Sequence, residues 1–250
     1  MICLITPTGA RPSQFTLCMR WMQRQTYTGE VVWIIVDDAQ PRTTTGVTET
    51  FREGWTIEKV YPVPLWRPGL NTQGRNMIVA LDRIGDYQPE CIFIIEDDDY
   101  YRPTYLERMM ANLKTFDAIG EAQTIYYNVF YNRYIRNANT SHASLFQTAF
   151  TPKLIPLMRK CHSHKFIDAE FWKHATNKHL FRENDLAIGI KGMPGRNGIG
   201  AGHSRAMNMA FDVNMKFLTN LIGDDALQYK QYYGTRSQPR YDILTRKSYK

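Results

Sequence analysis

Residues 91–101 read CIFIIEDDDYY, and this stretch decides the fold. Its first five residues are apolar and include three isoleucines, a composition typical of a strand that is buried on both faces of a sheet. The strand leads directly into four consecutive carboxylates, Glu96, Asp97, Asp98 and Asp99. Carboxylates this close repel one another unless water or a cation lies between them, and a cluster of oxygen ligands suits Mg²⁺ or Mn²⁺. Because ligands of parallel α/β sheets bind at the carboxyl ends of the strands, we favour a metal site here over a solvated acidic turn.

Strands and helices alternate on both sides of this stretch. Apolar runs predict strands over residues 2–6, 31–36 and 57–60, and helices are predicted over about residues 13–25 and 71–81. Ser13 is the expected N-cap of the first helix, and Thr104 with Glu107 forms the pattern of a capping box for a helix after the carboxylates. This alternation predicts a mostly parallel α/β sheet.

The pattern changes after Gly120. Residues 123–134 are rich in Tyr, Val, Ile and Phe and predict antiparallel strands, and short helices are predicted over residues 152–160 and around Asp168. A loop that contains six glycines spans residues 189–202.

The composition predicts a globular protein. The chain has 250 residues, of which 43% are hydrophobic, and four scattered cysteines that we expect to be buried thiols in a reducing compartment. No apolar run approaches the length of a membrane span, and the first residues lack the pattern of a signal peptide. We therefore expect a cytoplasmic protein without a transmembrane segment. The oligomeric state stays open.

Charge is distributed unevenly along the chain. Residues 1–125 carry a net charge of −4, whereas residues 126–250 hold 19 Lys and Arg against 8 Asp and Glu, a net charge of +11. A basic half beside a carboxylate-rich half indicates an anionic partner in addition to a metal-bound ligand. The alternative is a charge that serves solubility alone.

Four stretches stand in a fixed order along the first half of the chain. They are ITPTGARP at residues 5–12, QTY at 25–27 followed by VVWIIVDD at 31–38, the pair Arg75-Asn76, and IIEDDDYYRPTYLE at 94–107. Together they resemble glycosyltransferases of the GT-A fold, close to the family-2 group. The resemblance implies an α/β fold with a mostly parallel sheet, helices on both of its faces and a smaller antiparallel region on the acceptor side. Residues 1–120 would bind a nucleotide-sugar, residues 121–225 would bind the acceptor, and residues 226–250 would form a basic, tyrosine-rich tail.

The acidic stretch matches the metal-binding Asp-x-Asp motif of this family, in one of two registers, residues 96–98 or 97–99. The resemblance implies that Asp98 binds Mn²⁺ or Mg²⁺ directly and that Asp97 lies near the ribose or a metal-bound water. His203, after the glycine-rich loop, matches a histidine that completes the metal shell in many relatives. A lone histidine is more often structural, so that alternative stays open.

The donor implied by the resemblance is a nucleoside-diphosphate sugar, with uridine favoured. Asp38 or Asp37 would contact the uracil or the ribose, Thr6 and Pro7 would line the base, and Arg196 would bind phosphate. The remaining cofactor-binding candidates, from the matching stretches, are Thr8, Arg11, Arg75 and Asp97.

An acidic residue at the start of a helix deprotonates the acceptor hydroxyl in this family. Asp168 is the first candidate for this base here and Glu170 the second, and we favour direct displacement with inversion. The alternative is that Asp168 caps the helix and Glu170 stabilises its first turn.

The favoured acceptor is a hydroxymethylated pyrimidine in DNA, as for a phage-type DNA-base glycosyltransferase acting in the host cytoplasm. The net charge of +11 and the Tyr, Lys and Arg of the tail suit phosphates and base stacking. The alternatives are a glycosyltransferase that acts on a surface glycan or a lipid-linked sugar, a nucleotidyltransferase, and a non-catalytic DNA-binding protein.

Overall fold

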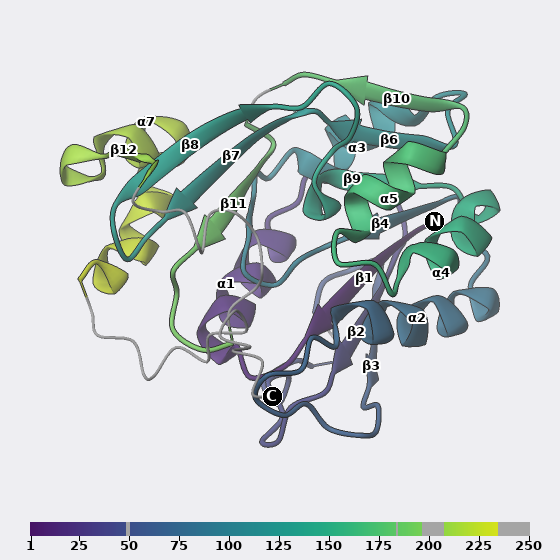
Figure 1. Ribbon diagram of the computed structural model, residues 1–250. Coiled ribbons are helices and arrows are strands. Elements are labelled where there is room, and N and C mark those ends of the chain that lie inside the picture. The colour runs from purple at the N-terminus through teal and green to yellow at the C-terminus, as the bar shows by residue number, and fades with distance from the viewer. Residues whose placement is uncertain (49–50, 184, 197–207, 235–250) are drawn as a thin grey trace, which may run out of the picture.

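A computed structural model of the chain describes residues 1–48, 51–183, 185–196 and 208–234. A seven-stranded sheet runs through these residues in the order β10-β6-β9-β4-β1-β2-β3, and β4 lies at its centre (Figure 1). Its strands are β1 (Ile2–Thr8), β2 (Val31–Asp37), β3 (Trp55–Val60), β4 (Cys91–Ile94), β6 (Ala118–Glu121), β9 (Thr148–Phe150) and β10 (Lys178–Phe181). The pairs β4–β1, β1–β2, β2–β3 and β6–β10 are parallel, and β9 lies antiparallel between β4 and β6.

A smaller five-stranded sheet has the order β12-β8-β7-β11-β5. Its strands are β5 (Tyr100–Tyr101), β7 (Gln123–Asn128), β8 (Arg133–Ala138), β11 (Ala187–Lys191) and β12 (Ala210–Phe211). All of its pairs are antiparallel except β7–β11. Because β5 follows the acidic stretch directly, this sheet lies next to the carboxyl end of β4.

Helices cover both faces of the larger sheet. Alternate side chains of β1 point to opposite faces: Leu4 packs in the core with α1 (Pro12–Gln23), and Ile5 packs in the core with α2 (Gln73–Arg83). In Figure 1, α1 lies on one side of the sheet, and α2, α4 and α5 lie on the other. The other helices are α3 (Tyr105–Leu113), α4 (Ile155–Cys161), α5 (Ile167–His174) and α7 (Lys216–Ile222), with 3₁₀ helices η1 (Ile84–Asp86), η2 (Leu145–Gln147), η3 (Pro152–Leu154), η5 (Val213–Met215) and η6 (Gly223–Tyr232).

The predicted elements are found within a few residues of their expected positions, and the mostly parallel sheet with a smaller antiparallel region is confirmed. All four cysteines belong to the described residues and are buried free thiols. Within the described residues, every helix is too short or too polar to cross a lipid bilayer.

The helix caps agree with the prediction only in the position of Thr104. Arg11, not Ser13, is the N-cap residue of α1, because Pro12 occupies the first helical position, where a missing N–H costs nothing. Thr104 is the N-cap of α3 but its side chain makes no capping hydrogen bond there, and Glu107 instead accepts a hydrogen bond from Thr26 Oγ1 at 2.6 Å. Asp168 lies in the first turn of α5, after the N-cap residue Phe166.

Candidate active site

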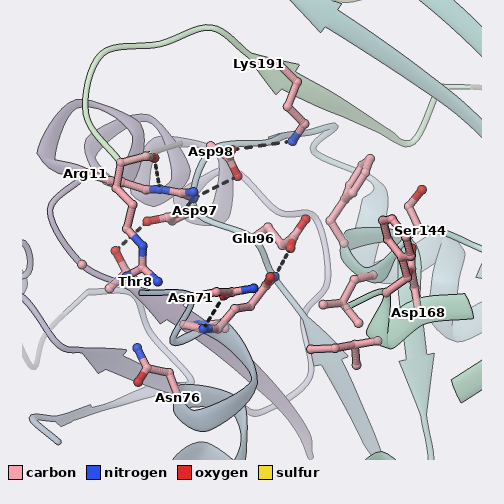
Figure 2. A pocket seen from close by; sticks show the side chains of 18 of the residues that line it. Thr8, Arg11, Asn71, Asn76, Glu96, Asp97, Asp98, Ser144, Asp168 and Lys191 are labelled. Atoms are coloured by element: carbon pink, nitrogen blue, oxygen red, sulfur yellow. Dashed lines mark hydrogen bonds and ion pairs between the residues drawn. The ribbon is translucent and has the colours of Figure 1, made fainter. Parts of the chain in front are cut away.

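A pocket opens at the carboxyl ends of β1 and β4 (Figure 2). Its first wall comes from the end of β1, the start of α1, the start of α2 and the acidic stretch. The opposite wall comes from β7, η2 and the start of α5. The first wall contains Pro7, Thr8, Gly9, Arg11, Asn71, Gln73, Asn76, Glu96, Asp97 and Asp98. The second contains Tyr126, Ser144, Leu145, Phe146, Lys165, Phe166, Ile167 and Asp168, and Lys191 and Arg196 complete the lining.

Asp97, just after β4, is hydrogen-bonded to the end of β1 at the base of the pocket. Its Oδ2 accepts a hydrogen bond from Thr8 Oγ1 at 2.6 Å, and its Oδ1 accepts one from Arg11 Nη1 at 2.6 Å. Both oxygens of this buried carboxylate are therefore engaged by the end of β1 and the start of α1. Burial raises the pKa of Asp97, and the positive charge of Arg11 opposes that shift.

Arg11 is itself held by a segment far along the chain. Its Nε donates to the carbonyl oxygen of Arg196 at 2.7 Å, and Gln14 Nε2 donates to the carbonyl oxygen of Pro194 at 2.6 Å. Gly195 has φ +108°, and a Cβ there would lie 2.9 Å from the carbonyl oxygen of Ala10. The chain can approach the start of α1 this closely only because that residue is glycine.

Asp98 lies between two fixed cations. Arg11 Nη1 is 3.4 Å from its Oδ1, and Lys191 Nζ is 3.6 Å from its Oδ2. Lys191 also donates to Asp99 Oδ1 at 2.7 Å, an oxygen that accepts the backbone N–H of Ile190 at 2.9 Å as well. Figure 2 shows Arg11 and Lys191 on opposite sides of Asp98.

The carboxylates fit a divalent cation. Glu96, Asp98 and Asp99 each offer one oxygen, and these three oxygens lie within 4.8 Å of one another. Asp99 Oδ2 is buried and has no hydrogen-bond partner among the described residues, so one oxygen at this site is left to be satisfied. Hard oxygen ligands of this kind suit Mg²⁺ or Mn²⁺.

Burial and repulsion between neighbouring carboxylates raise the pKa values of Glu96 and Asp99. The pKa of Glu96 is raised to about 7, first by burial, while Lys191 opposes the shift and Asp98 adds to it. Burial likewise raises the pKa of Asp99. The negative charge of Asp168 across the pocket raises the pKa of Glu96 slightly further.

Asp38 anchors a second network beside the pocket. Its Oδ2 accepts from Arg75 Nη2 at 2.8 Å and also from Thr72 Oγ1, and its Oδ1 accepts from Arg196 Nη1 at 3.2 Å. Gly9, at φ +151°, is needed here because a Cβ would lie 2.1 Å from Asp38 Oδ1. Burial, together with repulsion from nearby Arg11, lowers the pKa of Arg196 to about 10.

The predicted nucleotide-binding residues divide into two groups. Pro7, Thr8, Arg11, Asp97 and Arg196 line the pocket, and Arg75 and Asp38 connect to it through Arg196. Two other candidates turn inward. Asp37 accepts hydrogen bonds from the backbone N–H groups of Ala39 and Thr44, and Thr6 Oγ1 accepts the indole N–H of Trp33 at 2.8 Å.

The two candidate bases point to different surroundings. Asp168 lines the pocket, its Oδ1 accepts the backbone N–H of Ala169 at 2.9 Å, and burial raises its pKa. Glu170 lies outside the lining, where its Oε1 pairs with His174 Nε2 at 3.0 Å. The third metal candidate, His203, lies outside the described residues.

Several pocket residues were not predicted. Lys191 ends a buried strand, and nothing in its neighbourhood in the sequence indicates that it meets carboxylates more than 90 residues away. Gln73 donates a hydrogen bond to Glu96 Oε1 from the first turn of α2. The wall formed by Ser144, Phe146 and Phe166 carries no sequence motif that would have identified it.

Comparison with solved structures identifies the fold. No protein-family model matches the chain, and no curated protein sequence matches it. Among solved structures, S. aureus TarS 1-349 matches with a TM-score of 0.54 and 13% identity over 76% of this chain and 60% of that chain. The complex of TarS 1-349 with UDP-GlcNAc matches with a TM-score of 0.51 and 13% identity over 92% of this chain and 71% of the other. The fold is GT-A.

This likeness concerns the fold and not the whole neighbouring protein. A structure of S. aureus TarS matches with a TM-score of 0.50 and 13% identity over 76% of this chain, but over only 37% of that chain. The chain therefore spans well under two thirds of TarS. The predicted GT-A architecture is confirmed at this level.

Proposed function

We propose that the chain is a metal-dependent glycosyltransferase that moves a sugar from a nucleoside-diphosphate sugar to a hydroxyl group. The observation that carries the proposal is the carboxylate cluster at the carboxyl end of β4, which faces Asp168 across one pocket of a GT-A fold. A metal ion that neutralises the departing diphosphate and a general base that takes the acceptor proton both promote direct sugar transfer.

Asp98 is the proposed direct metal ligand, and Glu96 and Asp99 each offer a further oxygen within 4.8 Å of it. When bound, Mn²⁺ or Mg²⁺ supplies positive charge that stabilises the departing diphosphate. Asp97 would act beside the metal, near the ribose or a metal-bound water, because Thr8 and Arg11 already engage both of its oxygens. His203 remains the proposed ligand from the second half of the chain.

Residues 1–120 would hold the donor. Pro7, Thr8 and Arg196 would contact the nucleotide, and Asp38 with Arg75 would bind or position the uracil or the ribose. Uridine is favoured because TarS, which shares the fold, was solved with UDP-GlcNAc. Thr6 and Asp37 would act on the nucleotide-binding end of the site only indirectly, because their side chains are hydrogen-bonded to other groups inside the protein.

Asp168 is the proposed general base. As the acceptor oxygen attacks the anomeric carbon, the acceptor proton passes to Asp168 and the bond between that carbon and the diphosphate oxygen breaks. This single displacement inverts the anomeric configuration. The raised pKa of Asp168 suits the task, because a more basic carboxylate takes a hydroxyl proton more readily.

Residues 121–225 would bind the acceptor, and the favoured acceptor is a hydroxymethylated pyrimidine in DNA. A net charge of +11 over residues 126–250 favours a polyanion. Tyr126, Phe146 and Phe166 give the acceptor side of the pocket aromatic character, and Lys165 lies at its edge. A base flipped out of the duplex could stack on such a wall. In the tail, residues 235–250 lie outside the described residues.

A donor screen tests both halves of this proposal. The chain is incubated with Mn²⁺ and a panel of nucleotide-sugars, with or without duplex DNA that carries hydroxymethylated bases, and released nucleoside diphosphate is measured. Release that requires one donor, the metal and the modified DNA is the expected result. Release that is independent of DNA would reject the DNA acceptor and favour a glycan or lipid-linked one, and release of pyrophosphate would identify a nucleotidyltransferase.

A further inference from the structure

Lys191 stands out as a buried cation inside the carboxylate cluster. It is the last residue of β11, its side chain is 6% exposed, and it still lines the pocket. Its Nζ lies 2.7 Å from Asp99 Oδ1 and 3.6 Å from Asp98 Oδ2. Two of the three oxygens that suit a metal are therefore on residues that already pair with an ammonium group.

Lys191 occupies part of the space that a metal ion would use. Within the described residues, Arg11 pairs with Asp97 and Asp98, and Lys191 pairs with Asp98 and Asp99. Lys191 and a divalent cation bound at Glu96, Asp98 and Asp99 would therefore share two carboxylates, and their like charges would repel each other at short range.

The ammonium group of Lys191 also lies at the interior of the pocket. Its Nζ is 5.8 Å from the ring centres of Tyr126 and Phe146, both of which line the pocket on its far wall. The group therefore lies between the carboxylates and the pocket interior. A flexible four-carbon stem allows it to pair with a new anion nearby.

We propose that Lys191 is part of the donor site and has two roles there. Its ammonium group competes with the divalent ion for Asp98 and Asp99, and it pairs with a phosphate oxygen of the bound nucleoside diphosphate. This inference rests on the proposed function. It adds a diphosphate-binding residue that the acidic motif does not reveal. Removal of the lysine should consequently shift the two affinities in opposite directions.

The test measures binding, not turnover. For wild type and Lys191→Met, titration calorimetry gives the Kd of Mn²⁺ without nucleotide and the Kd of UDP with EDTA present. We expect Lys191→Met to bind Mn²⁺ about tenfold more tightly and metal-free UDP about tenfold more weakly, since each affinity changes by one nearby charge. Lys191→Arg keeps the charge and should stay close to wild type in both measurements. Lys216→Met, which removes an exposed lysine at the start of α7, is the matched control.

Asp99 is buried, so Lys191→Met could unfold the protein by leaving that charge unpaired. In that case Lys191→Met is made in an Asp99→Asn background and compared with the Asp99→Asn protein by the UDP titration alone, because Asp99→Asn itself removes one of the proposed metal oxygens. UDP binding that is unchanged by Lys191→Met, or Mn²⁺ binding that does not tighten, would overturn the inference and leave Lys191 as a structural counter-ion. A wild type that binds neither UDP nor any other nucleoside diphosphate would overturn the proposed function itself.

Discussion

Glu170 Oε1 lies 3.0 Å from Nε2 of His174, one turn further along α5, whereas Asp168 lies at the pocket. Two acidic residues in the same helical turn therefore have different surroundings. The first interacts with its own helix at the surface, and the second is placed where an acceptor hydroxyl would meet the donor.

This difference predicts that Asp168→Asn lowers kcat by about 10²–10⁴-fold, the range for loss of a general base, and leaves the Kd of UDP unchanged. Glu170→Gln is the matched control and should retain wild-type kcat. Steady-state kinetics on the two variants, with UDP titrations alongside, provide the measurement. Equal losses in both variants would contradict the assignment of Asp168 as the base.

Thr6 is predicted to matter for stability rather than for nucleotide binding. Its Oγ1 accepts the buried indole N–H of Trp33, and Thr6→Val would leave that donor unpaired without changing the shape of the side chain. We expect a loss of about 1–3 kcal/mol in the free energy of unfolding and an unchanged Kd for UDP. Urea denaturation measures the first quantity, and Thr56→Val, at an exposed position of β3, is the control. A weakened UDP affinity in Thr6→Val would instead place the side chain in the base site.

Glu121 is predicted to make stability depend on pH. It is fully buried, Gln147 Nε2 donates to its Oε2 at 2.8 Å, and its Oε1 has no hydrogen-bond partner among the described residues. Burial raises its pKa from 4.5 to about 7. Between these two values the folded state keeps a proton that the unfolded chain has released, so the free energy of unfolding falls as pH rises through that window.

The expected loss from this group is up to about 3 kcal/mol by pH 8. Glu121→Gln cannot ionise and should therefore gain stability relative to wild type as pH rises from 5 to 8, whereas Glu30→Gln, at an exposed position, should not. Denaturation curves across this pH range give the comparison. Parallel pH profiles for wild type and Glu121→Gln would show that the carboxyl group is already ionised in the folded protein at pH 5.

Local patterns in the sequence predict most of the larger sheet. The runs that form β1, β2 and β4 are apolar over most of their length and almost entirely buried, as expected for strands with helices on both faces. The carboxylates follow the central strand closely. The insertion of β9 antiparallel between β4 and β6 was not predicted, because it pairs segments more than 50 residues apart. Sequence periodicity carries no information about such pairing.

The same limit applies to the candidate site. The acidic stretch and Asp168 were found because each occupies a recognisable place, after a strand or near a helix start. Lys191 reaches the pocket only through the second sheet, in which β11 pairs with β5 directly after the acidic stretch. Thr6 was predicted to face the nucleotide, but strand alternation turns its side chain toward Trp33.

Metal dependence at Asp98 is the centre of the proposed mechanism, and Asp98→Asn tests it with little change in shape. The most direct measurement is nucleoside-diphosphate release from the active donor by wild type and Asp98→Asn, with Mn²⁺ and with EDTA. Asp86→Asn, an exposed residue of η1, is the matched control, and circular dichroism checks that each variant is folded.

We predict that wild type and Asp86→Asn release nucleoside diphosphate in Mn²⁺, that EDTA abolishes this release, and that added Mn²⁺ restores it. Folded Asp98→Asn should release none. Wild-type release that persists in EDTA, or Asp98→Asn release equal to wild type, would contradict a metal-dependent transfer at this cluster.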